Sequence, residues 1–320
     1  MHRLQGARAV GALIVVFALA SLALASGSAM AKASAQPNKP AHGKQKKSGS
    51  GKQHVANLPV VPGSQYLALG DSVTFGYMES QVVPAPDYQN AAAFLGYPEQ
   101  LGAELHLSVA NASCPGETSS SLINVSAPSN GCENNPAHTS SNYRTSYPLH
   151  ASYRGSQLAF ALSYLRTHHN VRLVTLMIGA NDFFVCQETT SDSCASTAEQ
   201  NATAASVTRN IHTILSAVRS KAHYEGQIVI VNYYSLNYAS PTDNGLSLLL
   251  NKVQDSAAAP FHVKIADGYG ELEAASVHSG DDTCTAGLLT QIGPGMCGIH
   301  PSYAGQALLA QVLEKTIKLS

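Results

Sequence analysis

Two short segments without polar alternation restrict the fold of this chain more than any other feature. Residues 171–178 (VRLVTLMI) and 227–233 (QIVIVNY) are nearly continuously apolar. Such runs are typical of strands that are buried on both faces of a parallel sheet. Residues 65–69 (QYLAL), which end at Gly70, and residues 106–110 are shorter strand candidates. We therefore expect a central parallel sheet.

Helical patterns separate these strands. In each pattern, apolar residues recur at intervals of three and four, which places them on one face of a helix. The four sets are Leu158, Ala161, Leu162 and Leu165; Val207, Ile211, Ile214, Leu215 and Val218; Leu246, Leu249, Leu250 and Val253; and Leu309, Val312, Leu313 and Ile317. Strands that alternate with helices predict an α/β fold class, in which helices cover both faces of the sheet.

The charge of the chain is unevenly distributed. Residues 1–60 hold eight Lys or Arg and no Asp or Glu, and in residues 61–320 the remaining 11 bases face 20 acids, a formal charge of −9. Charged residues make up only 12% of the whole chain, which is well below the usual share. An acidic domain with few charges does not suit a phosphate backbone, so nucleic acid is not an expected partner.

The N-terminal segment has the three parts of a secretory signal peptide. Basic residues precede an apolar run over 9–25, and small-residue cleavage sites follow, ending at Ala31 or Ala35. The alternative is a membrane anchor, but this run of 17 residues is shorter than the roughly 20 that span a bilayer. We predict a signal peptide over 1–31, with cleavage as late as residue 35, and a secreted, extracellular protein.

The next segment, 32–63, is rich in Lys, Gly and Ser. It has too little apolar surface to offset the entropy of ordering, so we expect a disordered basic linker. One domain over 64–320 would follow. A basic linker is suited to weak contact with an anionic cell wall or membrane surface, although a spacer without a specific partner is the simpler interpretation.

Six cysteines, all in the predicted domain, are consistent with an oxidising compartment. They fall into three couples that are close in sequence, and each couple brackets a segment that is predicted as loop. We therefore favour three local disulfides, namely Cys114–Cys132, Cys186–Cys194 and Cys284–Cys297. The chain has no C-x-x-C motif or tight Cys/His spacing of the kind that binds zinc, so no metal site is expected.

Polar residues follow the predicted strands at their carboxyl ends, where a parallel sheet places its ligands. Ser72 ends a Gly-Asp-Ser turn directly after the first strand, Gly116 lies in the turn after the second, and Asn181 follows the third. His300 precedes the last helical pattern. Each residue alone also suits an ordinary turn or helix cap, but the ordered set is more specific.

The ordered set resembles the GDSL-type (SGNH) hydrolase family, which is named after a Ser, a Gly, an Asn and a His. Residues 67–77 (LALGDSVTFGY) are similar to the first family block, 111–118 (NASCPGET) to the second, 178–182 (IGAND) to the third and 300–305 (HPSYAG) to the fifth. The resemblance covers about residues 64–320. It implies a three-layer, flavodoxin-like parallel sheet flanked by helices, and the cysteine couples are similar to those of the secreted, disulfide-bonded lipase and esterase branch.

The resemblance also implies roles for the four residues. Ser72 would be the nucleophile that forms an acyl-enzyme, and His300 would be its general base. The backbone N–H groups of Ser72 and Gly116 and the side-chain amide of Asn181 would hold the oxyanion of the tetrahedral intermediates. This chemistry requires no cofactor.

One position departs from the family pattern. The family usually has an Asp three residues before the His, and Cys297 occupies that position here. Two kinds of acceptor for the far imidazole nitrogen remain: a backbone carbonyl near Cys297, or the side chain of Asp281 or Asp282. We favour the carbonyl, because a bridged loop would hold it close to His300.

The expected function is that of a secreted serine ester hydrolase, an esterase or lipase that acts as a monomer on a small-molecule or lipid ester. The sequence leaves the acyl chain and the alcohol open. Two alternatives remain: a carbohydrate O-acetyl esterase of the same fold, and a non-catalytic surface-binding protein that keeps the site residues as relics. The second is disfavoured, because all four site residues are present.

Overall fold

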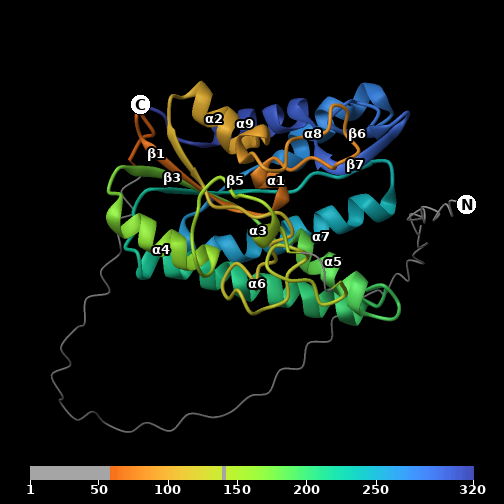
Figure 1. Ribbon diagram of the computed structural model, residues 1–320, viewed down its shortest axis with the longest axis horizontal. Helices are drawn as coiled ribbons and strands as arrows, with labels where there is room; N and C mark the ends of the chain where they lie inside the picture. Colours follow the sequence, from red (N-terminus) through yellow and green to blue (C-terminus); the bar gives the residue numbers. More distant parts are fainter. Residues whose placement is uncertain (1–57, 139–141) are drawn as a thin grey trace, which may run out of the picture. The chain divides into compact units, whose positions relative to one another are not determined.

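The computed structural model describes residues 58–138 and 142–320. The predicted signal peptide and most of the predicted linker lie outside these residues. Within them, one sheet of five strands forms the centre of the domain (Figure 1). Its strands are β1 (Gln65–Gly70), β2 (Ser108–Asn111), β3 (Val171–Met177), β4 (Gln227–Val231) and β5 (Lys264–Ala266).

The strand order of the sheet is β2-β1-β3-β4-β5, and every neighbouring pair is parallel. This is the flavodoxin-like order, in which the winding of the chain reverses between β1 and β3. The predicted α/β fold class, a three-layer, flavodoxin-like parallel sheet, is therefore confirmed. The strands predicted over 65–69, 171–178 and 227–233 are present with ends that shift by one or two residues.

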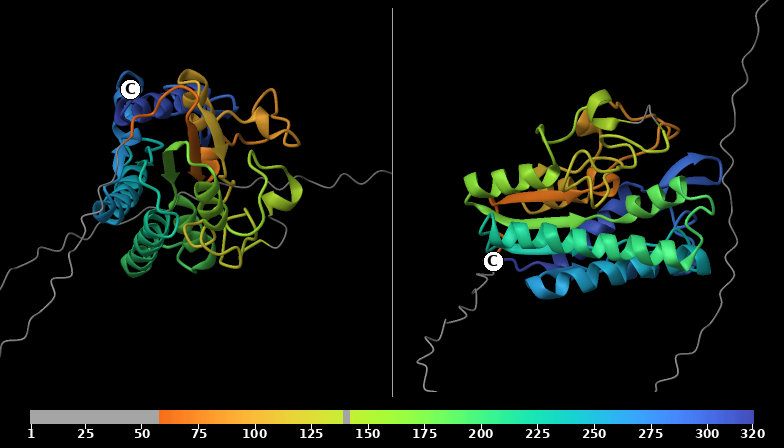
Figure 2. Two further views of the ribbon diagram at one scale, coloured as in Figure 1. Left: turned by 90° about the vertical axis from the view of Figure 1, so that its left-hand side faces the viewer. Right: turned by 90° about the horizontal axis from the view of Figure 1, so that it is seen from below.

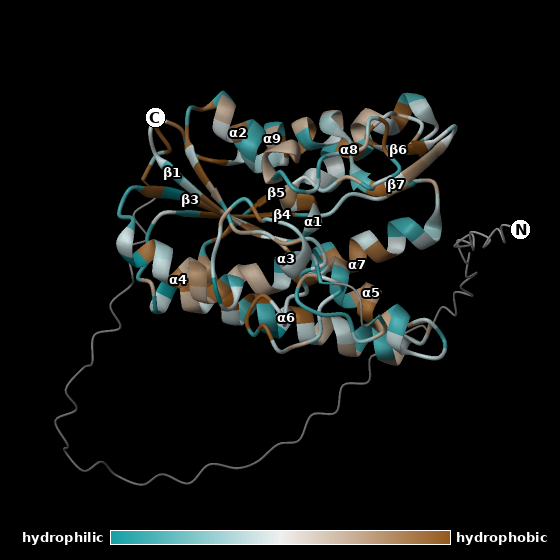
Figure 3. Cartoon of the chain, in the orientation of Figure 1, coloured by the Kyte–Doolittle hydropathy of each residue, from teal (hydrophilic) through white to brown (hydrophobic). Residues whose placement is uncertain are grey.

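Helices cover both faces of this sheet. Their bounds are α1 (Ser72–Phe75), α2 (Tyr97–Glu104), α3 (Tyr143–Ser146), α4 (Gln157–Thr167), α5 (Ala180–Thr189), α6 (Thr197–Ser220), α7 (Pro241–Ala258), α8 (Gly268–Ser276) and α9 (Tyr303–Thr316). Helices α2, α8 and α9 lie on one face, and α4, α6 and α7 lie on the other (Figures 1 and 2). The strands between these layers are hydrophobic along most of their length, whereas the helices carry both kinds of residue (Figure 3).

Serine caps begin the four long helices that carry the predicted apolar stripes. In α4, α6, α7 and α9, the hydroxyl of the capping serine accepts a hydrogen bond from the backbone N–H three residues further on. These bonds satisfy N–H groups that have no partner inside the helix. The apolar stripes themselves are buried: in α6, for example, Val207, Ile211 and Ile214 are no more than 1% exposed. Burial of this face supplies most of the stability of such helices.

Three strands were not anticipated from the sequence. Strand β5 has only three residues, and the hairpin of β6 (Leu289–Gly293) and β7 (Met296–Pro301) forms a separate antiparallel pair. The segment between Cys284 and Cys297 is thus not only loop, as we predicted, because it contains β6. The hairpin was missed because most of its residues are partly or fully exposed, and only its ends near Leu289 and Pro301 are buried, which leaves no apolar alternation to detect.

The domain begins earlier than the predicted boundary at residue 64. Val60 is buried, and its N–H donates to the carbonyl of Lys318 at 2.9 Å. Gly63 donates in the same way to His106 at 2.8 Å. Residues 58–63 of the predicted linker therefore pack on the domain. A buried valine, a β-bridge between Val60 and Leu319 and two backbone hydrogen bonds, one to Lys318 and one to His106, hold them there.

The structure pairs the six cysteines as the three local couples. The Sγ–Sγ distances are 2.02 Å for Cys114–Cys132, 1.95 Å for Cys186–Cys194 and 2.12 Å for Cys284–Cys297. The first of these bridges lies in a small core of its own, separate from the main one, where it packs with aromatic rings. The buried members of this second core are Phe75, Phe94, Cys114, Cys132 and Tyr143.

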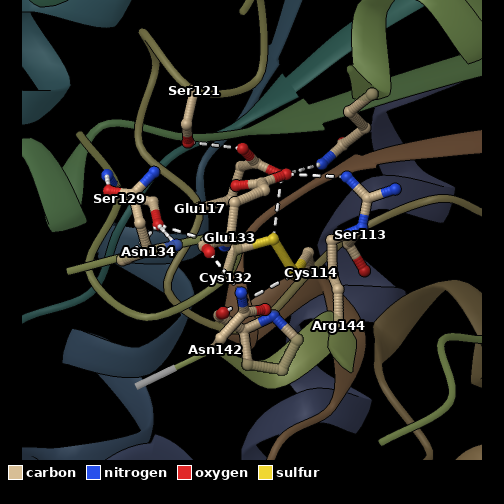
Figure 4. Close-up of a disulfide and its surroundings, with 12 residues drawn as sticks. Ser113, Cys114, Glu117, Ser121, Ser129, Cys132, Glu133, Asn134, Asn142 and Arg144 are labelled. Atoms are coloured by element: carbon tan, nitrogen blue, oxygen red, sulfur yellow. Dashed lines mark hydrogen bonds and ion pairs between the residues drawn. A yellow bond between two sulfur atoms is a disulfide. The ribbon is translucent and has the colours of Figure 1, made fainter. Parts of the chain in front are cut away.

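Glu117 is buried beside the Cys114–Cys132 bridge, among hydroxyl and amide groups (Figure 4). Ser121 Oγ donates to its Oε1 at 2.5 Å, and Gln157 Nε2 donates to its Oε2 at 3.1 Å. Cys132 Sγ lies 3.5 Å from the same Oε2. A disulfide sulfur has no hydrogen to donate, so a hydrogen bond along this line requires a proton on Glu117. Bridged sulfurs are also not thiolates, so this cluster is not a metal site.

Burial raises the pKa of Glu117 to about 8, and the nearby carboxylate of Glu133 contributes to the increase. The folded protein therefore holds a proton on Glu117 between about pH 4.5 and 8, where the unfolded chain has lost it. Because the folded state binds the extra proton, its free energy of unfolding falls as the pH rises through this window.

A Glu117→Gln variant tests this linkage. The amide keeps the shape of a protonated carboxyl group and cannot ionise. We expect the loss of unfolding free energy between about pH 5 and pH 8 to be smaller than in the wild type by about 2–4 kcal/mol, since one pKa unit corresponds to about 1.4 kcal/mol. Urea denaturation at both pH values measures the difference. Glu104→Gln, at an exposed position, is the matched control, and equal pH slopes for all three proteins would contradict the prediction.

Candidate active site

Ser72 is placed at the carboxyl end of β1 by a glycine that no other residue can replace. Gly70 has φ +155°, and a Cβ atom on it would lie 2.2 Å from Thr74 Oγ1 and 2.5 Å from the carbonyl oxygen of Met177. The next residue, Asp71, caps α1 by accepting a hydrogen bond from Val73 N–H at 3.0 Å. Ser72 is thus the first residue of a short helix directly after the strand, at the edge where parallel sheets bind ligands.

His300 lies beside this serine, although the two residues are 228 positions apart. Its Nε2 atom is 2.9 Å from Ser72 Oγ, which is hydrogen-bond distance. His300 lies in strand β7, shortly before the last helix, α9. The structure therefore brings together the predicted nucleophile and the predicted base.

The other imidazole nitrogen contacts a residue that we did not predict. His300 Nδ1 is 2.8 Å from Glu79 Oε1. The expectation of a backbone carbonyl near Cys297 is therefore wrong, and the alternative of Asp281 or Asp282 is wrong as well. Asp282 instead accepts hydrogen bonds within its own turn and from the side chain of Asn237.

Glu79 is held against the hairpin that carries His300. The backbone N–H of Ile299 donates to its Oε1 at 3.0 Å, and the hydroxyl of Thr290 donates to its Oε2 at 2.5 Å. At Gly298 a Cβ atom would lie only 2.0 Å from Glu79 Oε1, so the strand needs glycine there to admit the carboxylate. The N–H of Ile299, the hydroxyl of Thr290 and the space left by Gly298 thus hold the carboxylate of Glu79 against the imidazole.

The loop that supplies Glu79 is braced by aromatic packing. The ring of Tyr77 lies 4.9 Å from that of His300, edge to face, and Tyr88 donates its hydroxyl proton to the carbonyl of Met78 at 2.6 Å. Glu79 is the only acid between Asp71 and Asp87, which is the one sequence signal that pointed to it. A single Glu in a loop does not reveal its partner, because the contact forms only when the distant hairpin folds against the loop.

The charge of Glu79 is stabilised by its neighbours. Burial alone would raise the pKa of this carboxyl group, but the hydrogen bond and positive charge of His300 and the hydrogen bond from Thr290 outweigh it, so that the pKa falls to about 2. Glu79 is therefore a carboxylate at neutral pH. A carboxylate only accepts hydrogen bonds, so His300 must carry its proton on Nδ1 and present the free electron pair of Nε2 to Ser72.

Three predicted oxyanion donors line one cavity with Ser72 and His300. Among the described residues, the backbone N–H groups of Ser72 and Gly116 have no hydrogen-bond partner. Gly116 has φ +82°, and a Cβ atom on it would lie 2.3 Å from the carbonyl oxygen of Asn130. This position therefore requires glycine on both steric and conformational grounds.

The side chain of Asn181 is oriented by two neighbours. Asn130 Nδ2 donates to its Oδ1 at 2.9 Å, and its own Nδ2 lies 3.4 Å from Asp71 Oδ2. Because the Oδ1 atom is occupied by a donor, the amide nitrogen is the end that faces Asp71. Burial raises the pKa of Asp71 to about 6, against the opposing effect of the hydrogen bond from Tyr233. The sequence contained Asn130 and Tyr233 without any signal for this role.

A second contact joins the loop of Gly116 to the helix of Asn181. Asp182 accepts hydrogen bonds from the backbone N–H of Ser119 at 2.8 Å and from its hydroxyl at 2.6 Å. Together with the bond between Asn130 and Asn181, it fixes the relative positions of two oxyanion donors that come from different segments. Donors that are held in place before reaction stabilise a transition state most effectively.

The chain belongs to the GDSL-like lipase/acylhydrolase family, because the sequence model of this family matches residues 68–308. The matched range includes Ser72, Gly116, Asn181 and His300. The chain is accordingly a carboxylic ester hydrolase by family.

Several solved structures are similar to this chain. Phospholipase A1 from Streptomyces albidoflavus NA297 is 20% identical, with 79% of this chain and 99% of that chain covered and a TM-score of 0.49. Axe2, an acetylxylan esterase from Geobacillus stearothermophilus, is 14% identical, with 81% and 95% covered and a TM-score of 0.49. No curated protein sequence matches the chain. At these identities the similarity concerns the fold and does not identify a substrate.

Replacement of Glu79 by Gln is expected to impair turnover strongly. An amide can donate to Nδ1 and so favours the tautomer in which the wrong nitrogen faces Ser72. The corresponding loss in a serine-protease triad is about 10⁴ in kcat, so we expect a decrease of about 10³–10⁴. Steady-state hydrolysis of p-nitrophenyl butanoate measures it. Asp281→Asn is the matched control, since Asn tolerates the left-handed backbone at that position (φ 60°). A larger loss of kcat in this control than in Glu79→Gln would indicate that Asp281, and not Glu79, orients His300.

Asn130 is expected to act on turnover through Asn181. Asn181→Ala removes one oxyanion donor and should lower kcat by about 10²–10³. Asn130→Ala frees the amide to rotate and should lower kcat by about tenfold with little change in KM. If Asn130 acts only through Asn181, adding Asn130→Ala to the Asn181→Ala variant should have no further effect. Additive losses would disprove the coupling, and Asn124→Ala, at an exposed position of the same loop, is the control.

Proposed function

We propose that the protein is a serine ester hydrolase in which Ser72 is acylated by the substrate. The observation that carries this proposal is the continuous chain of contacts from Ser72 Oγ to His300 Nε2 and from His300 Nδ1 to Glu79, at 2.9 and 2.8 Å. A serine hydroxyl becomes nucleophilic only beside a base, and the base needs a third group to orient it. These three residues supply the nucleophile, the base and the orienting acid.

The reaction follows from these positions. As Ser72 Oγ attacks the ester carbonyl carbon, His300 Nε2 takes the hydroxyl proton, and the carbonyl oxygen becomes an oxyanion. The N–H groups of Ser72 and Gly116 and the Asn181 amide are the donors for this charge. His300 then returns the proton to the alcohol oxygen as the ester bond breaks. Water repeats the sequence on the acyl-enzyme and releases the acid.

Glu79 has an electrostatic part in both steps. Each attack leaves a positive imidazolium on His300, and a carboxylate at 2.8 Å stabilises that charge in a partly buried site where solvent screens it weakly. Since the pKa of Glu79 is lowered to about 2, the acid stays ionised throughout the neutral range. The alternative of a non-catalytic surface protein does not account for so complete a set of reacting groups.

Export is part of the proposed function. Three disulfides are typical of proteins in an oxidising, extracellular environment. Within the part of the chain that the structure describes, no helix has the length and hydrophobicity to cross a membrane. We retain the signal peptide over 1–31 and the basic linker after it as proposals, since both rest on the sequence.

Ser72→Ala tests the proposed nucleophile. We expect kcat for p-nitrophenyl butanoate to fall by about 10⁴ or more, because removal of a catalytic serine disables the whole triad. A fluorophosphonate probe should label the wild type on the peptide that contains Ser72, as measured by mass spectrometry, and should not label the variant. Ser163→Ala, at an exposed position on α4, should retain both activity and labelling. Substantial hydrolysis by a natively folded Ser72→Ala protein would refute the assignment.

A further inference from the structure

An apolar cavity of about 250 Å³ opens directly from Ser72. Its wall is built by side chains of α1, α5, α7 and the segment after β4. Its apolar members include Val73, Phe183, Phe184, Leu236, Leu246 and Leu250. Since a water molecule occupies about 30 Å³, the cavity has room for far more than the methyl group of an acetate.

Tyr233, Tyr234 and Ser247 already have hydrogen-bond partners in this cavity. The lining residues Gln187, Thr242 and Asp243 are at partly or fully exposed positions. Tyr233 donates to Asp71, and Tyr234 donates its hydroxyl proton to the carbonyl of Ile299 at 2.6 Å. Ser247 Oγ donates to the carbonyl of Tyr234 at 2.9 Å. These groups therefore have little capacity left for a polar ligand, and an apolar chain suits the space best.

Helix α7 forms one wall along the length of the apolar cavity. Leu250 lies beside Gly179, where a Cβ atom would be 2.8 Å from Leu250 Cδ1, and Gly179 is two residues before Asn181. The cavity continues to Leu246 and to Thr242, at the beginning of the helix. The eight helical steps from Leu250 back to Thr242 correspond to about 12 Å of helix. An acyl chain bound to Ser72 would run along this wall, away from the oxyanion donors.

A second cavity, of about 410 Å³, meets the first at Ser72 and has a different lining. Amides, hydroxyls and tyrosine rings line it, and none of its described lining residues is Lys or Arg. Tyr147, which is 36% exposed, also lines this cavity, and its hydroxyl has no hydrogen-bond partner among the described residues. An accessible hydroxyl without a partner can donate or accept a hydrogen bond, so Tyr147 is a group available to a bound hydroxyl. Without a cation, a phosphate in this cavity would lose hydration with no compensating charge.

From the two linings we propose that the substrate is a neutral ester of a fatty acid with a hydroxyl-rich alcohol, whose acyl chain lies in the apolar cavity and whose alcohol lies in the polar one. The proposal rests on the proposed Ser72 chemistry. This substrate differs from that of an O-acetyl esterase, whose acetyl group would leave most of the apolar cavity empty. It also differs from an ester with an anionic lipid headgroup. Glycerol and sugars are the two sources of such an alcohol.

Acyl length is tested with the p-nitrophenyl esters of acetic, butanoic and octanoic acid on the full chain. Each buried methylene should raise kcat/KM by about two- to fourfold, so octanoate should exceed acetate by about 10² or more. Leu246→Trp fills the far part of the cavity and should lower the ratio of octanoate to acetate by about tenfold. Leu248→Trp, half exposed on the same helix, is the matched control. A preference for acetate, or equal ratios in both variants, would overturn the acyl assignment.

The alcohol is tested with one acyl chain on three alcohols: 1-octanoylglycerol, 6-O-octanoylglucose and 1-octanoylglycerol 3-phosphate. We expect the phosphate ester to have the lowest kcat/KM by about tenfold or more, and the better of the other two identifies the source of the alcohol. Tyr147→Phe removes only the free hydroxyl and should lower the ratio of the preferred neutral ester to p-nitrophenyl octanoate by about three- to tenfold. Tyr164→Phe on α4 is the control.

The outcomes separate the two proposals. Preference for the phosphate ester, or an unchanged ratio in Tyr147→Phe, would overturn the assignment of the alcohol cavity. If the fluorophosphonate probe labels Ser72 and acetate is nevertheless preferred, the substrate class is wrong and the proposed function stands. If the probe does not label Ser72 and no ester is hydrolysed, the proposed function itself fails.

Discussion

The close parallel pairing of β1 with β3 is the constraint on which the rest of the site depends. Gly70 at the end of β1 pairs with Met177 at the end of β3, so the segments that leave these two strands emerge side by side. One begins with Ser72 and the other leads to Asn181. The winding of the sheet reverses at this pair, which leaves the space above it free of crossing helices. The approach is so close that only glycine fits at position 70.

Segments outside these two strands complete the reaction centre, and each is braced by contacts of its own. The loop after β2 brings Gly116 and is tied to α5 through Asn130 and Asp182. The hairpin brings His300 and is joined to the preceding turn by the Cys284–Cys297 bridge. Bracing matters here because catalysis depends on donors and bases that need no rearrangement when charge develops. The Cys284–Cys297 bridge and these hydrogen bonds thus hold the proposed site residues in place.

Glu79 shows that the acid in contact with the imidazole can come from a different segment of the chain than the family pattern predicts. An imidazole base requires an acceptor at its far nitrogen, and the physical requirement does not specify which segment supplies it. Glu79 meets it from the loop after the nucleophile, on the opposite side of the imidazole ring from Ser72. Its charge is maintained by His300 and Thr290 in spite of burial. The position three residues before His300 is thereby free to hold half of a disulfide.

The sequence by itself determined the fold class, the central strands, the long helices and the four residues that resemble the family blocks. Each of these depends on local patterns: apolar runs, helical periodicity, and turn residues directly after strands. Only the tertiary structure decided that Glu79 orients His300, that Asn130 orients Asn181, and that two cavities of unlike polarity meet at Ser72. Glu79 and His300 are 221 positions apart in the sequence, and Asn130 and Asn181 are 51 positions apart. Such contacts leave no periodic signal in one sequence, because they arise only when separate segments pack together.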